Sequence, residues 1–327
     1  MPRKIASLAS MFSIALLSIL LAGCGFGPGE TGSFEKTMTV TGPVQLEITN
    51  GSGRVEIRSG ESGQVRIHAE LTVWSSPFGE SGNRLDTIKN HPPVDQQGNL
   101  IRIDSRGDAF NQVRVEYTIY VPAETEVRAH TGSGNMEVSD IQGPASLQTG
   151  SGRIIGHRIH GETEAKTGSG SIELIDVASR AMAETGSGGI ELSRIGGEIR
   201  ATTGSGSIHM DRTPEKIVAH TGSGGITISG ATRDLRASSG SGSVHIEGNP
   251  AASSYWDIQA SSGGITMTVP SDAGFRLHAR SGSGSLESDL PITMEETLGR
   301  HEIRGRIGNG SASVDLRTGS GGIHIRR

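Results

Sequence analysis

Apolar and polar residues alternate along this chain in a pattern that repeats every 18 residues. A phrase of four residues, Thr-Gly-Ser-Gly or Ser-Gly-Ser-Gly, marks each repeat and begins at Thr131, Thr149, Thr167, Thr185, Thr203, Thr221 and Ser239. Apolar residues follow five and, in most repeats, seven positions after the start of each phrase, which is the two-residue period of a β-strand. A second, shorter alternation precedes each phrase. Each repeat therefore predicts two strands whose apolar faces point to one interior.

A unit of this length cannot bury a core alone and must stack on copies of itself. We predict an all-β, single-domain β-solenoid with regular coils over residues 131–242, each coil adding about 4.8 Å along the axis. The phrase glycines are assigned to turns in which the chain needs a positive φ. A flexible linker would lack apolar positions in phase with its glycines. A calcium-binding β-roll would need an Asp in the turn, which no phrase contains.

The coils at the two ends are irregular. The β pattern starts at Phe34, and further strands are predicted at 44–48, 55–57, 65–73, 101–103, 113–121 and 127–129. Residues 75–99 contain several Pro, Gly and Asn and predict a loop with a short helix around Arg84 to Lys89. After Ser239 the interval between phrases becomes 21, and the segment 314–325 predicts a hairpin that covers the last coil.

The first 24 residues predict a signal peptide, because Arg3 and Lys4 precede an apolar run over 8–21 that is too short to cross a bilayer comfortably. The run ends in Leu-Ala-Gly-Cys, which resembles the bacterial lipobox. That resemblance implies lipidation of Cys24, the only Cys of the chain, and hence a membrane partner through the lipid anchor. Residues 25–33 predict a tether. Gly25, where an Asp would resemble an inner-membrane signal, favours the outer membrane if the organism has one.

The charge of the chain argues against nucleic acid as a partner. The formal net charge is −5, and removal of the leader with Arg3 and Lys4 makes it about −7. The 49 glycines would indicate disorder if they were unpatterned, but the repeat accounts for them. A single Cys excludes an internal disulfide.

Several motifs together resemble a known bacterial family. They are GPVQLEITNGSGRVEI from residue 42, VPAETEVRAHTGSG from residue 121, the TGSGxI ladder and NGSASVDLRTGSGGIHI from residue 309. The chain is similar over residues 34–327 to a family of β-strand repeat domains of unknown function described as candidate adhesins, which resembles the head-GIN adhesins. The resemblance implies a single-domain solenoid on the cell envelope. It brings no catalytic residues, because the family has none established.

Residues 18 apart are neighbours in a stack, so a chemical site would appear as matched residues in adjacent repeats. One such ladder reads Asp140, Arg158, Asp176, Arg194 and Arg212, and we interpret it as exposed ion pairs.

Other titratable residues predict no chemistry. Glu173 and Glu191 are neighbours but no cleft is indicated around them. His209 and His245 are two coils apart, about 9.6 Å, which is too far for one metal. His157 and His160 lack a further ligand. We therefore predict no catalytic residue, no metal site, no cofactor and no enzymatic activity.

Aromatic residues are absent between Val121 and Ser254, so a recognition site is expected at the irregular ends. Trp74, Phe78 and Tyr255 are the candidates, whereas Trp256 falls in the inward register. The sequence favours a non-catalytic envelope lipoprotein that acts as an adhesin or interaction scaffold for a protein or glycan ligand. A regulatory or sensing component of the envelope stress response stays open as an alternative, and a polysaccharide-acting enzyme is less favoured.

Overall fold

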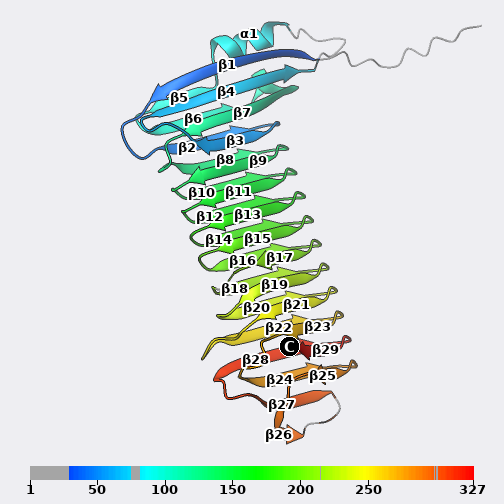
Figure 1. Ribbon diagram of the computed structural model, residues 1–327. Coiled ribbons are helices and arrows are strands. Elements are labelled where there is room, and N and C mark those ends of the chain that lie inside the picture. Colours follow the sequence, from blue (N-terminus) through cyan, green and yellow to red (C-terminus); the bar gives the residue numbers. More distant parts are fainter. Residues whose placement is uncertain (1–28, 75–81, 214, 298, 300) are drawn as a thin grey trace, which may run out of the picture.

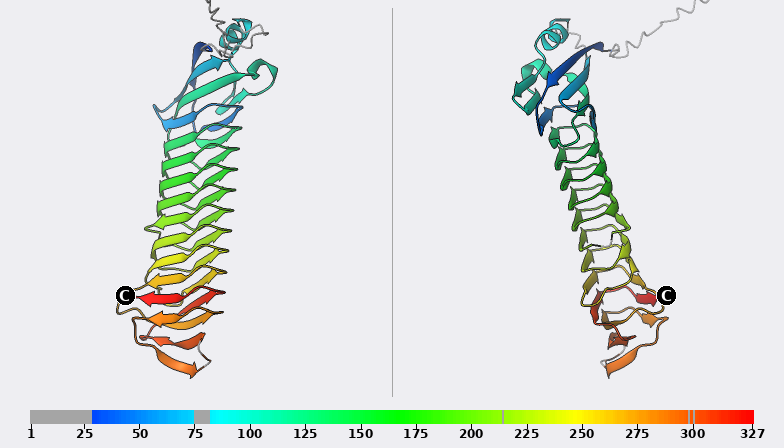
Figure 2. Two further views of the ribbon diagram at one scale, coloured as in Figure 1. Left: turned by 90° about the vertical axis from the view of Figure 1, so that its right-hand side faces the viewer. Right: turned by 60° about the vertical axis from the view of Figure 1, so that its left-hand side comes forward.

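The computed structural model describes residues 29–74, 82–213, 215–297, 299 and 301–327. These residues form an elongated stack of strands in two sheets that face each other (Figures 1 and 2). The predicted all-β solenoid is confirmed. The predicted signal peptide, Cys24 and Phe78 lie outside the described residues. No helix among the described residues has the length and apolar character needed to span a bilayer.

Sheet A contains 14 described strands in this spatial order: β1 (Glu30–Thr39), β4 (Gln64–Val73), β7 (Val113–Val121), β3 (Val55–Ser59), β9 (Met136–Ile141), β11 (Ile154–Ile159), β13 (Ile172–Val177), β15 (Ile190–Ile195), β17 (Ile208–Asp211), β19 (Ile226–Ala231), β21 (Val244–Gly248), β23 (Ile265–Thr268), β29 (Ile323–Arg326) and β25 (Leu286–Ser288).

Sheet B contains 15 described strands in this spatial order: β26 (Thr293–Thr297), β27 (Glu302–Ile307), β24 (Phe275–Ser281), β28 (Ala312–Thr318), β22 (Tyr255–Ala260), β20 (Leu235–Ser239), β18 (Ile217–Thr221), β16 (Ile199–Thr203), β14 (Ala181–Thr185), β12 (Thr163–Thr167), β10 (Ala145–Thr149), β8 (Glu126–Thr131), β2 (Gln45–Asn50), β6 (Leu100–Ser105) and β5 (Val94–Gln97). The helix α1 (Gly82–Asn90) and the 3₁₀ turn η1 (Asp108–Phe110) complete the described elements.

Each regular coil contributes one parallel strand to each sheet, and neighbouring coils pair with an offset of 18 residues, as in Ile154 opposite Ile172. The predicted inward residues of both strands are buried. A further inward position, ten after the phrase start, was not predicted. It is buried as well and is occupied by Ile141, Ile159, Val177, Ile195, Thr213 and Ala231.

This third inward position exists because the residue before it has a left-handed backbone. The φ angle nine positions after the phrase start is 63° at Asp140, 52° at Arg158, 59° at Asp176, 54° at Arg194, 51° at Arg212 and 77° at Gly230. Such a residue interrupts the strict alternation of a strand. The side chains seven and ten positions after the phrase start can therefore both face inward. We call the five charged residues of this set the corner ladder.

The phrase glycines serve a different purpose from the predicted one, since none between Gly132 and Gly242 lies in the left-handed region. They allow coils to stack closely. A Cβ added to Gly188 would lie 1.8 Å from the carbonyl oxygen of Gly170 in the preceding coil. The prediction of turns at the phrases is confirmed, but the reason given for the glycines is wrong.

The hydroxyl of the Thr in each phrase forms hydrogen bonds with backbone groups of two closely stacked turns. Thr185 is buried, and its Oγ1 accepts a hydrogen bond from the N–H of Gly188 at 3.2 Å. The same hydroxyl donates to the carbonyl oxygen of Gly170 in the preceding coil at 2.8 Å. Equivalent pairs of bonds recur at Thr149, Thr167, Thr203, Thr221 and Ser239. The buried hydroxyls thus form a continuous ladder, which we call the turn ladder.

Both ends of the stack contain an inserted coil. The coil formed by β2 and β3 lies between the coils β6–β7 and β8–β9, although it precedes both in sequence. The coil formed by β28 and β29 lies between β22–β23 and β24–β25. Figure 1 shows this C-terminal coil in red between yellow and orange coils. The predicted terminal hairpin over the last coil is therefore wrong, and the interval of 21 between Ala260 and Ser281 spans two coils, with Thr318 between them.

Antiparallel strands and the helix cover the ends. At the N-terminal end β1 and β4 extend sheet A, and α1 packs on β1 through buried Leu85 and Ile88. The predicted helix is confirmed, whereas β5 was not predicted. β1 begins at Glu30, so the prediction that the tether extends to residue 33 is wrong. At the other end β27 pairs antiparallel with β24 and is covered by β26. Such end coverage protects open strand edges from pairing with other chains.

The close stacking predicts that adjacent glycines differ in their tolerance of a methyl group. Gly188→Ala places Cβ against the carbonyl of Gly170 and should lower the free energy of unfolding by about 1–3 kcal/mol, the usual cost of overpacking. Gly189→Ala is the matched control, because its Cβ would lie 3.5 Å from the nearest atom, and it should stay within about 1 kcal/mol of the wild type. Urea unfolding measures both. Equal effects of the two substitutions would contradict the stacking explanation.

Candidate functional site

Two of the three predicted recognition residues are described, and they lie far apart. Trp74 follows β4 near the N-terminal end of the stack and is 43% exposed. Tyr255 begins β22 toward the other end and is 44% exposed. Trp256 is fully buried, as predicted, and its Nε1–H donates to the carbonyl oxygen of Arg233 at 2.7 Å.

The segment 75–99 has a structural role that the sequence did not reveal. Leu85 and Ile88 of α1 are buried against β1, and β5 pairs with β6 at the edge of sheet B. Removal of this segment would therefore uncover two strand edges. Trp74 lies at the border of this segment.

The first four residues of the corner ladder neutralise each other in pairs, and Arg212 pairs with Asp211 beside it. The guanidinium of Arg158 donates to both carboxylate oxygens of Asp140, at 2.6 and 2.9 Å. Arg194 donates to both oxygens of Asp176 at 2.5 and 2.9 Å. These bonds lower the pKa of Asp140 and of Asp176 from their ordinary values. A shallow pocket of about 510 Å³ lies along this corner, but its charges already have partners.

The other titratable residues considered from the sequence form no cluster. Within the parts of the chain that the structure describes, no group of three or more His, Cys, Asp or Glu residues is arranged to hold a metal ion. Glu173 and Glu191 lie directly opposite each other on β13 and β15, as expected. His209 and His245 are separated by Thr227.

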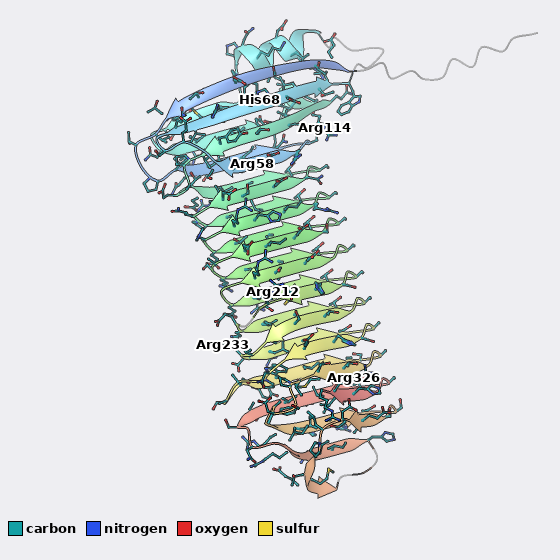
Figure 3. The ribbon with its side chains drawn as sticks, in the orientation of Figure 1. Arg58, His68, Arg114, Arg212, Arg233 and Arg326 are labelled. Carbon is teal, nitrogen blue, oxygen red and sulfur yellow. The ribbon has the colours of Figure 1, made fainter. Side chains whose placement is uncertain are left out.

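A second pocket lies on the outward face of sheet B beside Tyr255. Its volume is about 300 Å³, and its lining includes the side chains of Arg200, Lys216, Val218, Asp234, Arg236 and Tyr255. The pocket lies in the part of the stack that contains Arg233, which is labelled in Figure 3 and directly precedes Asp234 of the lining. We call this site the Tyr255 pocket. It is the only pocket among those described here that unites one of the predicted aromatic residues with several cationic side chains.

An insertion between β21 and β22 positions Tyr255. Ser253 has a left-handed backbone, with φ of 64°, and the N–H of Tyr255 donates to Oδ1 of Asp234 at 2.9 Å. Burial, and then the neighbouring carboxylates of Asp257 and Asp315, raise the pKa of the Tyr255 phenol. The hydroxyl therefore stays protonated at neutral pH and can donate a hydrogen bond to a ligand.

Two carboxylates lie next to the pocket in an unusual setting. Asp257 and Asp315 are directly opposite each other on β22 and β28, and each is only 8% exposed although it belongs to the outward face. Arg236 approaches Asp257 at 3.5 Å, and Arg317 bonds to Asp315. The sequence could have indicated the pair through the matched motifs Trp-Asp-Ile and Val-Asp-Leu, but the insertion of β28 beside β22 was not predictable.

The arrangement defines a stacked β-repeat protein with a surface pocket, and the comparison with known families is consistent with that class. A family model described as Toastrack DUF4097 matches residues 44–326. The chain therefore belongs to this family. This confirms the family resemblance of the repeat motifs, whereas the relation to head-GIN adhesins stays a prediction. No curated protein matches the chain significantly.

The chain is also similar at low identity to several solved structures. One, described as a candidate lipid-binding protein from Parabacteroides distasonis, has 14% identity and a TM-score of 0.39, covering 91% of this chain and 98% of that one. Another, described as a candidate adhesin from Bacteroides fragilis, has 11% identity and a TM-score of 0.38, covering 90% and 97%. A candidate adhesin from Parabacteroides merdae has 11% identity and a TM-score of 0.30, covering 90% and 96%. Similarities of this size carry no argument about function.

The corner ladder predicts a pH dependence of stability. The pKa values of Asp140 and Asp176 are lower in the folded protein than in the unfolded chain, so their contribution is present above the unfolded value of about 3.8 and is lost as the pH falls through the folded value. The variant with Asp140→Asn and Asp176→Asn should be less stable than the wild type at pH 7 by at most about 1 kcal/mol per pair, because both pairs are exposed. The difference should disappear at low pH.

Thermal unfolding at pH 7 and near pH 2 measures this effect. Asn tolerates the left-handed backbone at both positions, so the substitution removes the charge without adding backbone strain. A difference between variant and wild type that persists or grows at low pH would show that the ion pairs are not its cause.

Proposed function

We propose that the protein is a non-catalytic interaction protein of the cell envelope, of the adhesin type, that is anchored through lipidated Cys24 and binds its partner at the Tyr255 pocket. The observation that carries this proposal is the pocket itself, which combines an exposed aromatic ring with cationic side chains on a continuously hydrogen-bonded stack. Loops and insertions on such scaffolds are the usual positions of binding residues. The partner is a protein or a glycan.

The position of the pocket in the stack supports this assignment. The anchor precedes β1, which lies at one end of sheet A. Ten strand steps separate β1 from β21, the strand that leads to Tyr255, so the pocket lies about 50 Å along the stack at ~4.8 Å per step. An anchored chain would thus hold the pocket away from the bilayer. In an organism with two membranes, Gly25 favours the outer membrane as the site of anchoring.

Adherence of cells that carry the protein tests the proposal. Cells with the wild-type chain should adhere to some member of a panel of immobilised glycans and matrix proteins, and cells with the Tyr255→Ala chain should adhere at least about tenfold less, as expected for loss of an aromatic contact at the centre of a binding site. Cys24→Ser should leave the fold intact but release the protein from the membrane fraction and abolish adherence.

Two controls make the result decisive. Purified Tyr255→Ala should unfold at the temperature of the wild type, because the ring is half exposed. Trp74→Ala changes the other described aromatic candidate and should leave adherence unchanged. If Trp74→Ala abolishes adherence and Tyr255→Ala does not, the binding site lies at the N-terminal end and the assignment to the Tyr255 pocket is wrong.

A further inference from the structure

Two arginines of the Tyr255 pocket lie in the same outward register of sheet B. Arg200 on β16 is opposite Val218 on β18, and Val218 is opposite Arg236 on β20. The two arginines are therefore two strand steps apart along the axis, about 9.6 Å. Lys216 precedes β18 and adds a third cation to the lining. All three cations are exposed, and Val218 between them is half-buried.

The positive charge of the pocket is only partly neutralised. Lys216 approaches Glu198 at 3.4 Å, and Arg236 approaches Asp257 at 3.5 Å, each through a single long contact. Asp234, the one acidic residue of the lining, already accepts the N–H of Tyr255. The side chain of Arg200 forms no ion pair or hydrogen bond with any residue that the structure describes. In the corner ladder, by contrast, Arg158 and Arg194 each donate twice to one carboxylate.

The shape and lining of the pocket restrict the anion that would fit. A free guanidinium binds a carboxylate through two parallel hydrogen bonds. A volume of about 300 Å³ is at the lower end of ligand pockets and suits a small cyclic group. The half-buried side chain of Val218 and the exposed ring of Tyr255 offer apolar contact to such a group. The Tyr255 hydroxyl and the Asp234 carboxylate offer hydrogen bonds to hydroxyl groups.

We propose that the Tyr255 pocket binds a carboxylate-bearing sugar unit of a linear acidic polysaccharide. The sugar carboxylate pairs with Arg200, while the ring packs against Val218 and Tyr255. Lys216 and Arg236 lie between Arg200 and Tyr255 along the axis of the stack, so they offer further positive charge to the carboxylates of adjacent units of the polymer. This inference rests on the proposed function, since it names the class of ligand that the same pocket recognises.

Calorimetric titration of the full chain in detergent with tetragalacturonate tests this assignment, and the fully methyl-esterified tetramer serves as the neutral ligand of the same shape. The acid should bind at least about tenfold more tightly than the ester, which is the difference expected for one charge-assisted bidentate contact. Arg200→Ala and Tyr255→Ala should each weaken binding of the acid at least about tenfold. Tyr255→Phe should lose less than Tyr255→Ala, because the ring remains.

Arg276→Ala is the matched control, because Arg276 is an exposed cation of sheet B on β24, outside the pocket, without an ion pair in the described chain. It should leave affinity unchanged within about twofold. Inorganic phosphate at the same concentration should not compete, since it lacks a ring. The assignment is overturned if acid and ester bind alike, if neither binds, if Arg200→Ala has no effect, or if Arg276→Ala weakens binding as much as Arg200→Ala.

The adherence assay separates the two proposals. Adherence that depends on Tyr255, combined with no binding of the tetragalacturonate, would contradict the acidic-sugar ligand and leave the adhesive function standing. Binding of the acid by wild-type protein, combined with no adherence of cells that display it, would contradict the adhesive function and leave the ligand assignment standing.

Discussion

The carbonyl oxygen of one turn occupies the place where the side chain of a glycine in the next coil would be. This single steric constraint explains the repeat better than turn flexibility does, because it requires glycine at the same two positions of every regular coil and excludes slippage by even one residue. The buried hydroxyl of the turn ladder then satisfies the polar groups that close stacking removes from water. Strand pairing, burial of the apolar positions and the alignment of outward residues in ladders all follow from that register.

The alignment in ladders also decides where recognition can occur. Along the first four positions of the corner ladder, opposite charges meet in consecutive coils and neutralise each other, so this part of the surface offers little to a ligand. The repeat is interrupted between β21 and β22, and there the outward face gains Tyr255. Arg200, on the regular coil of β16, lines the same pocket and has no side-chain partner among the described residues. The site thus arises where the repetition ends, while the regular coils supply the support.

Much of the core could be predicted from the sequence, because the inward positions follow a period of two within a period of 18. Trp256 and the outward Tyr255 were assigned correctly for the same reason. The corner was missed, since Asp140 and Arg158 give no local sign that their backbone is left-handed. The inserted coils were missed because the strands β2 and β28 carry the same repeat pattern as their neighbours. Because this pattern lets any coil pair with any other, the prediction placed the coils in sequence order. In the structure the chain skips a coil at each end.

The carboxylates beside the Tyr255 pocket could not be predicted for a related reason. Asp257 and Asp315 are distant in sequence and become neighbours only through the insertion of β28. The charge balance of Arg236 depends on that neighbourhood as well.

The dimensions of a shortened protein test the central claim that stacking through identical turns determines the whole architecture. Deletion of residues 149–184 removes two complete coils, joins Gln148 to Thr185 as it was joined to Thr149, and brings Asp140 next to Arg194 in the corner ladder. The account predicts a folded protein whose maximum dimension in small-angle X-ray scattering is about 10 Å shorter, two steps of ~4.8 Å. An expanded scattering profile, or an unchanged maximum dimension, would contradict it.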